Sequence, residues 1–156
     1  MVRVLWNGRT RDALLSGLIV RYVERIRRSI PFRLEEAGQR GGGRQNSMSR
    51  AEGRRLASRL PEGAMVVALQ AGGQEMSSEQ FARWLEQLLS GGPGNLVFVL
   101  GGPDGLPEDV IRRASRSLSL SRMTLTHEMA RVFFLEQLYR ALTIIKGEKY
   151  HHGHVV

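Results

Sequence analysis

Apolar positions along this chain follow two periods, one of about two residues and one of about 3.6. Short apolar or alternating runs predict strands at 2–6, 32–34, 65–69, 96–100 and 118–120. Segments whose apolar residues recur three and four positions apart predict helices at 12–28, 78–89 and 127–146. Residues 49–59 are predicted to form a short basic helix with Arg50, Arg54 and Arg55 on its solvent side. Pro107, followed by Glu108 and Asp109, predicts one further helix, because proline is tolerated at the first helical position and acids there favour the helix dipole.

The predicted strands and helices alternate through most of the chain. Such alternation is typical of α/β proteins, so we predict a mostly parallel sheet with helices on both faces. The segment 96–100 is apolar throughout, as expected of a central parallel strand. No internal repeat is present, and residues 1–156 are predicted to form a single domain.

The last predicted helix is apolar on more than one side. Its apolar residues are Met129, Val132, Phe133, Leu135, Leu138, Tyr139, Leu142 and Ile145. A helix of this kind in a small domain often packs against a second copy of itself, which predicts a homodimer with Phe133 and Leu138 as candidate interface residues. The alternative is a central helix covered by its own chain. Glu136 and Arg140 have the spacing of an ion pair on one helix face.

The net charge of the chain indicates which kind of partner it binds. The chain has 23 Lys and Arg against 15 Asp and Glu, a net charge of +8, and only Lys146 and Lys149 are lysines. Guanidinium groups fork onto phosphates and stack on bases, which favours RNA as a partner over a membrane. The glycine- and arginine-rich segment 38–49 is predicted to be a loop that contacts RNA. A plain solubilising surface is the alternative.

Other features of the sequence indicate a cytoplasmic protein. The chain has no cysteine, which excludes disulfides and thiolate chemistry. It lacks an apolar run of the ~18 residues that a membrane span needs, and its first residues do not resemble an export signal. The histidines have no carboxylate at ligand spacing, so no metal site is expected. They are His127, His151, His152 and His154.

Three predicted loops follow strands and offer candidate ligand sites, at 69–73, 101–106 and 120–127. In open parallel sheets, ligands bind beyond the carboxyl ends of the strands, and glycines let backbone groups approach a ligand closely. The segment 101–106 matches neither the dinucleotide-binding fingerprint nor a P-loop, which disfavours a Rossmann oxidoreductase and a P-loop NTPase. A pair of tight turns is the alternative for this segment.

Three motifs in the second half of the chain resemble the RlmH family, SPOUT-class methyltransferases that act on large-subunit ribosomal RNA. Residues 96–106, LVFVLGGPDGL, resemble the family's "IGGPEGL" segment, and residues 117–127, SLSLSRMTLTH, resemble its "LSLSxMTxPH" loop. The spacing of its closing "RxxxxEQxYR…YH" helix and tail is matched by Arg131, Glu136, Gln137, Tyr139, Arg140, Tyr150 and His151. The resemblance is specific from about residue 96 onward and covers the whole chain in element order.

The resemblance implies a SPOUT-type fold with a trefoil knot in its C-terminal half. It implies S-adenosylmethionine bound in a bent shape within the knot, and a homodimer in which the tail of one subunit completes the site of the other. The expected product is a pseudouridine methylated at N3 in 23S-type RNA of the assembled ribosome.

By residue, the resemblance assigns contacts with the cofactor to Leu69, Gly102, Leu120, Ser121, Arg122, Met123, Thr124 and Leu125. It places His127, Tyr150 and His151 near the substrate. Two positions depart from the family's pattern. Thr126 stands where the family has proline, which is expected to loosen the loop, and His152 stands where it has Arg or Lys, so that the side chain would hold a phosphate only when protonated.

Methyl transfer from a sulfonium to a ring nitrogen is an in-line displacement, so the enzyme mainly aligns the reactants and removes water. Because N3 carries a proton, a group must accept it or stabilise the anion that forms. The candidates are His127, then Tyr150 and His151, while Arg131 would hold a phosphate or the ring oxyanion, or be an ordinary surface or ion-pairing arginine. Two alternatives stay open: a non-catalytic RNA-binding or ribosome-associated module on the same fold, and a SPOUT methyltransferase of another RNA, such as transfer RNA.

Overall fold

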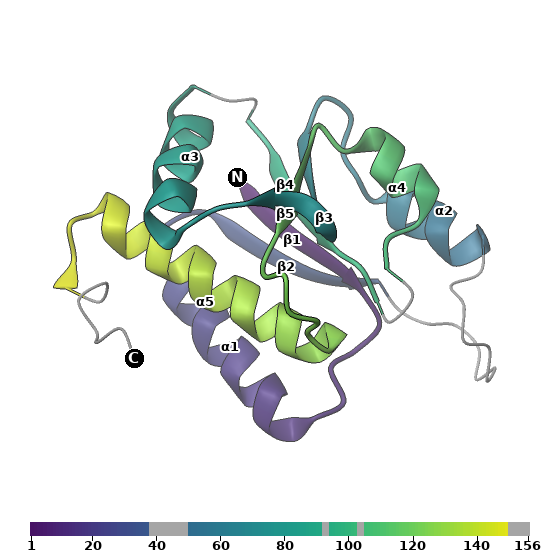
Figure 1. Ribbon diagram of the computed structural model, residues 1–156, viewed down its shortest axis with the longest axis horizontal. Coiled ribbons are helices and arrows are strands. Elements are labelled where there is room, and N and C mark those ends of the chain that lie inside the picture. Colours follow the sequence, from purple (N-terminus) through teal and green to yellow (C-terminus); the bar gives the residue numbers. More distant parts are fainter. Residues whose placement is uncertain (38–49, 92–93, 103–104, 150–156) are drawn as a thin grey trace.

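The protein contains a five-stranded parallel sheet with the strand order β2-β1-β4-β3-β5 (Figure 1). The structure, a computed structural model, describes residues 1–37, 50–91, 94–102 and 105–149. The strands are β1 (Val2–Asn7), β2 (Phe32–Ala37), β3 (Met65–Glu75), β4 (Leu96–Leu100) and β5 (Arg116–Ser119). The helices are α1 (Ala13–Arg27), α2 (Arg50–Ser58), α3 (Ser78–Gly91), α4 (Glu108–Arg113) and α5 (His127–Ile145).

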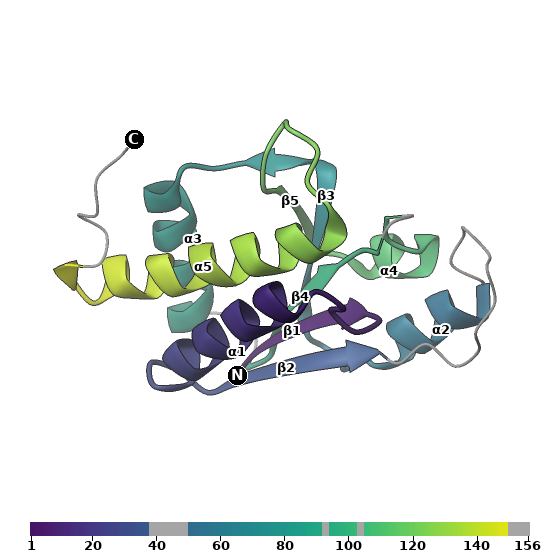
Figure 2. The same cartoon turned by 90° about the horizontal axis from the view of Figure 1, so that it is seen from below.

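Helices cover both faces of the sheet, as predicted. Side chains alternate along each strand, so Val4 and Phe98 pack beneath α1, α3 and α5, while Leu5 and Val99 pack beneath α2 and α4. Figures 1 and 2 show the two groups of helices on opposite sides of the strands. All five residues of β4 are buried, which confirms its predicted place inside the sheet.

Helix α5 lies between α1 and α3 and contacts both of them (Figure 1). Its side chains Leu135 and Leu138 are fully buried in the protein's own core, whereas Met129 and Phe133 are 43% and 37% exposed. The prediction that Leu138 lies at a subunit interface is therefore wrong, because α1 and α3 already cover that side of the helix. The predicted ion pair between Glu136 and Arg140 is present at 2.6 Å.

Two element boundaries differ from the predicted ones. Strand β3 does not end at Leu69 but continues to Glu75, with a register shift at which Leu118 of β5 pairs with both Leu69 and Gln74. Gly73 allows this bend, because a Cβ there would collide with the backbone of β5. Helix α4 begins at Glu108, so Pro107 is its N-cap and not its first residue.

None of the described helices is both long and apolar enough to cross a membrane. The trefoil knot stays a prediction from the resemblance.

Candidate ligand site at the carboxyl edge of the sheet

Three segments that the sequence singled out converge at one edge of the sheet. Leu69 of β3 pairs with Leu100, the last residue of β4, on one side and with Leu118, near the end of β5, on the other, so β4 and β5 end beside the same part of β3. Residues 70–73 continue β3 past this point, residues 101–102 follow β4, and residues 120–126 follow β5. Buried Leu69 and half-buried Gly102 and Leu120 therefore lie around a common region, as expected of residues that share a ligand.

The glycines after β4 form a narrow turn with one open side. The backbones of Gly102 and Gly105 exchange two hydrogen bonds, of 3.2 and 3.0 Å, and Gly105 has a φ of +82°. A Cβ at Gly101 would lie 2.5 Å from Gly105, whereas a Cβ at Gly102 would have no heavy atom within 4 Å. The space next to Gly102 is thus free to admit a ligand close to its backbone.

The 120–126 loop is held by its own side chains. Ser121 accepts a hydrogen bond from the backbone N–H of Met123 (2.9 Å), and its carbonyl accepts one from the hydroxyl of Ser119 (3.2 Å). Leu125 is half-buried, and the exposed residues of the loop are Arg122, Met123, Thr124 and Thr126. The loop thus presents both backbone groups and side chains at the sheet edge.

Thr126 closes this loop as the N-cap of α5. Its hydroxyl accepts a hydrogen bond from the N–H of Met129 at 3.3 Å, and its φ of −62° is one that proline also adopts. The departure from the family's proline therefore keeps the backbone conformation and adds a capping bond that proline cannot form. The structure does not show the loosening that the sequence suggested.

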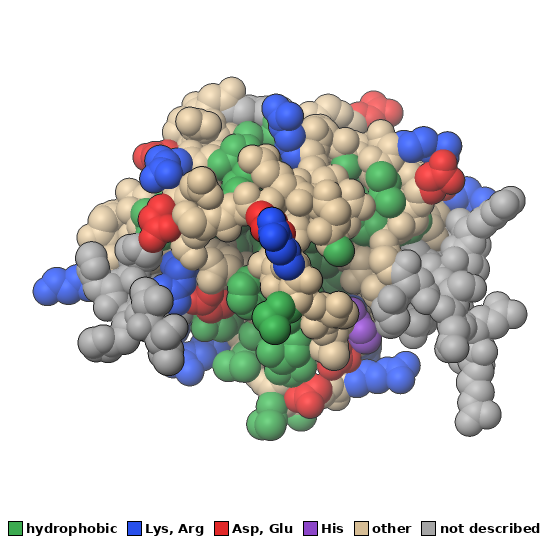
Figure 3. Space-filling view, in the orientation of Figure 1, with side chains coloured by type: hydrophobic (Ala, Val, Ile, Leu, Met, Phe, Trp, Pro, Cys, Tyr) green, Lys and Arg blue, Asp and Glu red, His purple; other side chains and the backbone are tan. Residues whose placement is uncertain are grey.

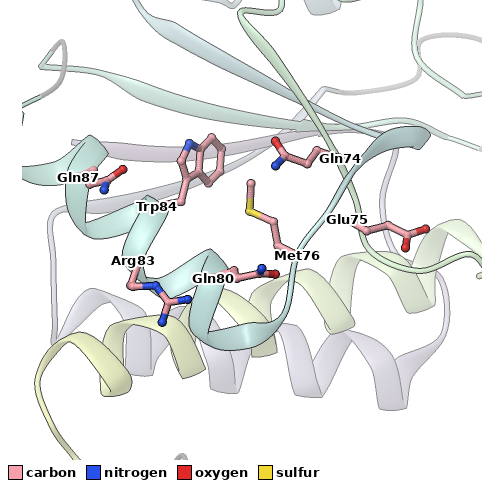
Figure 4. A pocket seen from close by; sticks show the side chains of 7 residues that line it. All are labelled: Gln74, Glu75, Met76, Gln80, Arg83, Trp84 and Gln87. Carbon is pink, nitrogen blue, oxygen red and sulfur yellow. The ribbon is translucent and has the colours of Figure 1, made fainter.

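An ion pair joins this loop to the end of β3. Nε of Arg122 lies 2.9 Å from Oε1 of Glu75. Glu75 also borders a pocket of about 300 Å³ between the end of β3 and α3, in which Met76 points toward the indole of Trp84 (Figure 4). The pocket is lined by Gln74, Glu75, Met76, Gln80, Arg83, Trp84 and Gln87. This lining holds one carboxylate and no nucleophile–base pair, which suits a binding volume better than a reaction centre.

His127 is the first residue of α5 and follows the loop directly. Its side chain is 32% exposed, and Nε2 lies 3.9 Å from Oε1 of Glu128. Burial is the main cause that lowers the pKa of His127 below 6.5, and the charge of Arg131 lowers it further, while Glu128 opposes both. The imidazole is therefore mostly neutral at pH 7 and able to accept a proton.

Arg131 lies one turn later and is buried inside the protein. It donates hydrogen bonds to the hydroxyl of Thr10 (2.9 Å) and to the carbonyl of Asn7 (2.7 Å), and its guanidinium carbon is 5.0 Å from the centre of the Trp6 ring. Burial lowers the pKa of Arg131, and its Nε has no hydrogen-bond partner within the described part of the chain. This arginine is neither a surface residue nor one side of a close ion pair. It ties α5 to the end of β1.

Sequence reasoning missed Glu128. Its carboxylate accepts hydrogen bonds from the backbone N–H groups of Arg11 (2.8 Å) and Asp12 (3.2 Å), and these two bonds are the main cause that lowers its pKa. An acid in the first turn of a helix is the only signal in the sequence, and it does not reveal a partner more than 110 residues away.

Several residues that the sequence singled out lie outside the described residues, namely Tyr150, His151, His152, His154 and the loop 38–49. Within the described ranges, no group of three or more His, Asp or Glu side chains could hold a metal ion.

The sheet order, the convergent loops and the imidazole beside them define a parallel α/β protein with a candidate ligand site at the carboxyl edge of its sheet. A family model described as "Predicted SPOUT methyltransferase" matches residues 1–151, and the chain belongs to this family.

Relatives in the same family match the chain over nearly its full length. "Ribosomal RNA large subunit methyltransferase H" of Geotalea daltonii is 44% identical, over 97% of this chain and 99% of the relative. The protein of the same name from Cytophaga hutchinsonii is 38% identical, over 95% and 97% of the two chains. A solved structure of "a probable methylase family protein" from Haemophilus influenzae has a TM-score of 0.53, covers 99% of this chain and 72% of its own, and is 12% identical, so its similarity concerns the fold alone.

Proposed function

We propose that this protein transfers a methyl group from S-adenosylmethionine to N3 of a pseudouridine in large-subunit ribosomal RNA of the assembled ribosome, in the cytoplasm. The observation that carries the proposal is the convergence of residues 69–73 of β3 with the segments that follow β4 and β5 at one edge of the sheet. The near full-length similarity to relatives named as ribosomal RNA large subunit methyltransferases supports the choice of substrate.

The cofactor is held by Leu69, Gly102 and the loop 120–125. The open space beside Gly102 and the buried side chain of Leu69 fit a ligand with both polar and apolar parts. S-adenosylmethionine, when bound, supplies an electrophilic methyl group on a sulfonium. The role of the protein is to orient the two reactants and to exclude water between them.

His127 accepts the proton that leaves N3. The lowered pKa of His127 keeps its imidazole neutral at pH 7, which a proton acceptor requires. Arg131 acts as a positioning residue, because its hydrogen bonds tie α5 to the end of β1 and its charge adds to burial in lowering the pKa of His127. Tyr150 and His151 of the partner subunit complete the site on the side of the substrate.

The protein works as a homodimer through the exposed faces of α1 and α5. Apolar side chains gather there, with Leu14 and Leu18 on α1 and Met129 and Phe133 on α5 exposed to solvent. Figure 3 shows hydrophobic side chains over these helices in the lower part of the view. A continuous apolar patch on two adjacent helices is typical of a surface that a second copy covers.

Transfer of tritiated methyl groups to ribosomes, to free subunits and to naked ribosomal RNA, followed by mapping of the labelled base, tests the proposal. We expect label at N3 of a pseudouridine and transfer to ribosomes above transfer to naked RNA. Label in transfer RNA would indicate another target. Failure to bind S-adenosylmethionine in calorimetry, with RNA binding intact, would indicate a non-catalytic module.

A further inference from the structure

The connection between β1 and α1 is fixed at its backbone on both sides. The N–H of Gly8 donates to the carbonyl of Ala37 at 2.8 Å, and the N–H groups of Arg11 and Asp12 donate to Glu128. The side chain of Arg131 on α5 donates to the hydroxyl of Thr10 in this segment and to the carbonyl of Asn7 just before it. The segment 8–12 lies outside helices and strands, yet these five hydrogen bonds anchor it and the adjoining Asn7.

The acidic and the basic side chains at this segment differ in what they contact. Asp12 accepts hydrogen bonds from two amides in the first turn of α1, at 2.9 and 3.0 Å, and Glu128 is occupied by two backbone amides with its side chain only 14% exposed. Arg9 and Arg11 are exposed, and neither forms an ion pair within the part of the chain that the structure describes. Because the carboxylates of Asp12 and Glu128 are taken up by backbone amides and do not pair with Arg9 or Arg11, the two guanidinium groups are free to bind an anion.

The segment 8–12 borders the proposed reaction site. Trp6 pairs with Leu100, so the chain leaves β1 beside the glycine turn that follows β4. Burial and then Arg131 lower the pKa of His127 most, and the charge of Arg11 adds to this effect, which places Arg11 in the electrostatic reach of the imidazole.

We propose that Arg9 and Arg11 bind backbone phosphates of the RNA strand that carries the target base. Guanidinium groups form paired hydrogen bonds with phosphate oxygens, and such contacts fix the register of a nucleic acid without reading its sequence. A backbone already held in place loses less conformational entropy when a ligand binds. The two arginines thus form a preformed phosphate site that lays the strand beside His127. The inference rests on the proposed function for its choice of RNA as ligand.

The test compares two double variants with the same loss of charge, R9Q/R11Q and R27Q/R28Q. Arg27 and Arg28 are also exposed but lie at the other end of α1, about 22 Å along the helix. Binding to ribosomes that lack the methyl group is measured from about 50 to 200 mM salt, together with affinity for S-adenosylmethionine and the melting temperature.

For R9Q/R11Q we expect the slope of log K against log salt to fall by about 1.4–1.8, since each lost phosphate contact removes about 0.7–0.9. Affinity for S-adenosylmethionine and the melting temperature stay as in the natural sequence, and R27Q/R28Q keeps the full slope. An unchanged slope in R9Q/R11Q, or an equal loss in both pairs, would overturn the inference. If the natural protein binds ribosomes with the expected arginine dependence but transfers no methyl group, the proposed function fails and the phosphate site stands.

Discussion

Arg122 and Glu75 form an ion pair of 2.9 Å that connects the proposed cofactor loop to the last residue of β3. Their side chains are 87% and 45% exposed, so the pair adds little to global stability, since exposed pairs contribute about 0–1 kcal/mol. Its effect is local, because it limits the positions that a loop at the ligand site can take.

Glu75→Gln should therefore weaken binding of S-adenosylmethionine about two- to fivefold, or about 0.4–1 kcal/mol, with little change in the melting temperature. Titration calorimetry at low salt measures the effect, and about 1 M salt should reduce it because exposed charges are screened. Glu86→Gln on the exposed face of α3 is the matched control. Equal affinities of the two variants would show that the pair does not restrain the loop.

Gly102→Val should abolish binding of S-adenosylmethionine while the fold persists. The added side chain meets no protein atom within 4 Å of its Cβ, so it enters the space that we assign to the cofactor. Gly91→Val at the end of α3, where a Cβ also meets nothing within 4 Å, serves as the control. Circular dichroism checks the fold and calorimetry the affinity. A folded Gly102→Val variant with normal affinity would contradict the assignment.

Phe133→Glu should give a folded monomer in sedimentation at micromolar concentration. The side chain is 37% exposed, so a charge is tolerated in the subunit but not in an apolar interface. Ile111→Glu is the control, because Ile111 is similarly exposed at 40% but lies on α4, beyond the opposite face of the sheet. By contrast, Leu138→Glu should unfold the protein, since it places a charge in the core. A natural protein that sediments as a monomer would refute the dimer.

The methylation rate should rise with pH through an apparent pKa below 6.5 and be level by pH 7, because only neutral His127 can accept a proton. Stability follows the same direction. The folded state disfavours protonated His127, so the free energy of unfolding should fall as pH drops below 6.5. Both effects should vanish in His127→Gln. Rate profiles over pH 5–8 and denaturant titrations measure the two effects. If the methylation rate of His127→Gln still rises with pH over this range, another group accepts the proton.

Mixing two inactive variants tests whether the active site is shared between subunits. One is Gly102→Val and the other ends at Lys149, which removes Tyr150 and His151. If the tail acts in the partner's site, each mixed dimer regains one complete site, and activity should return to roughly a quarter of normal after free exchange into statistical pairs. Exchange is followed by native mass spectrometry. A mixture that exchanges but stays inactive would place the tail in its own subunit's site.

Much of the fold follows from hydrophobic periodicity, because that signal is local. The predicted bounds of β4 match the structure, and those of α5 differ by one residue, 127–146 against His127–Ile145. The extension of β3 was missed, since Gly72 and Gly73 indicate a loop unless the close approach of β5 is known. The buried position of Arg131 could not be predicted from the sequence pattern either, because its partners Asn7 and Thr10 lie 124 and 121 residues away.

The strand order has a consequence for synthesis. β1 is flanked by β2 and β4, and β2 ends at Ala37, whereas β4 begins at Leu96. During synthesis, one edge of the apolar strand β1 therefore stays unpaired until about 60 more residues have been added. This takes roughly 3–12 s at 5–20 residues per second. An unpaired edge is a template for pairing with other chains. The nascent chain of this protein therefore passes through a period in which one edge of β1 is open to pairing with other chains.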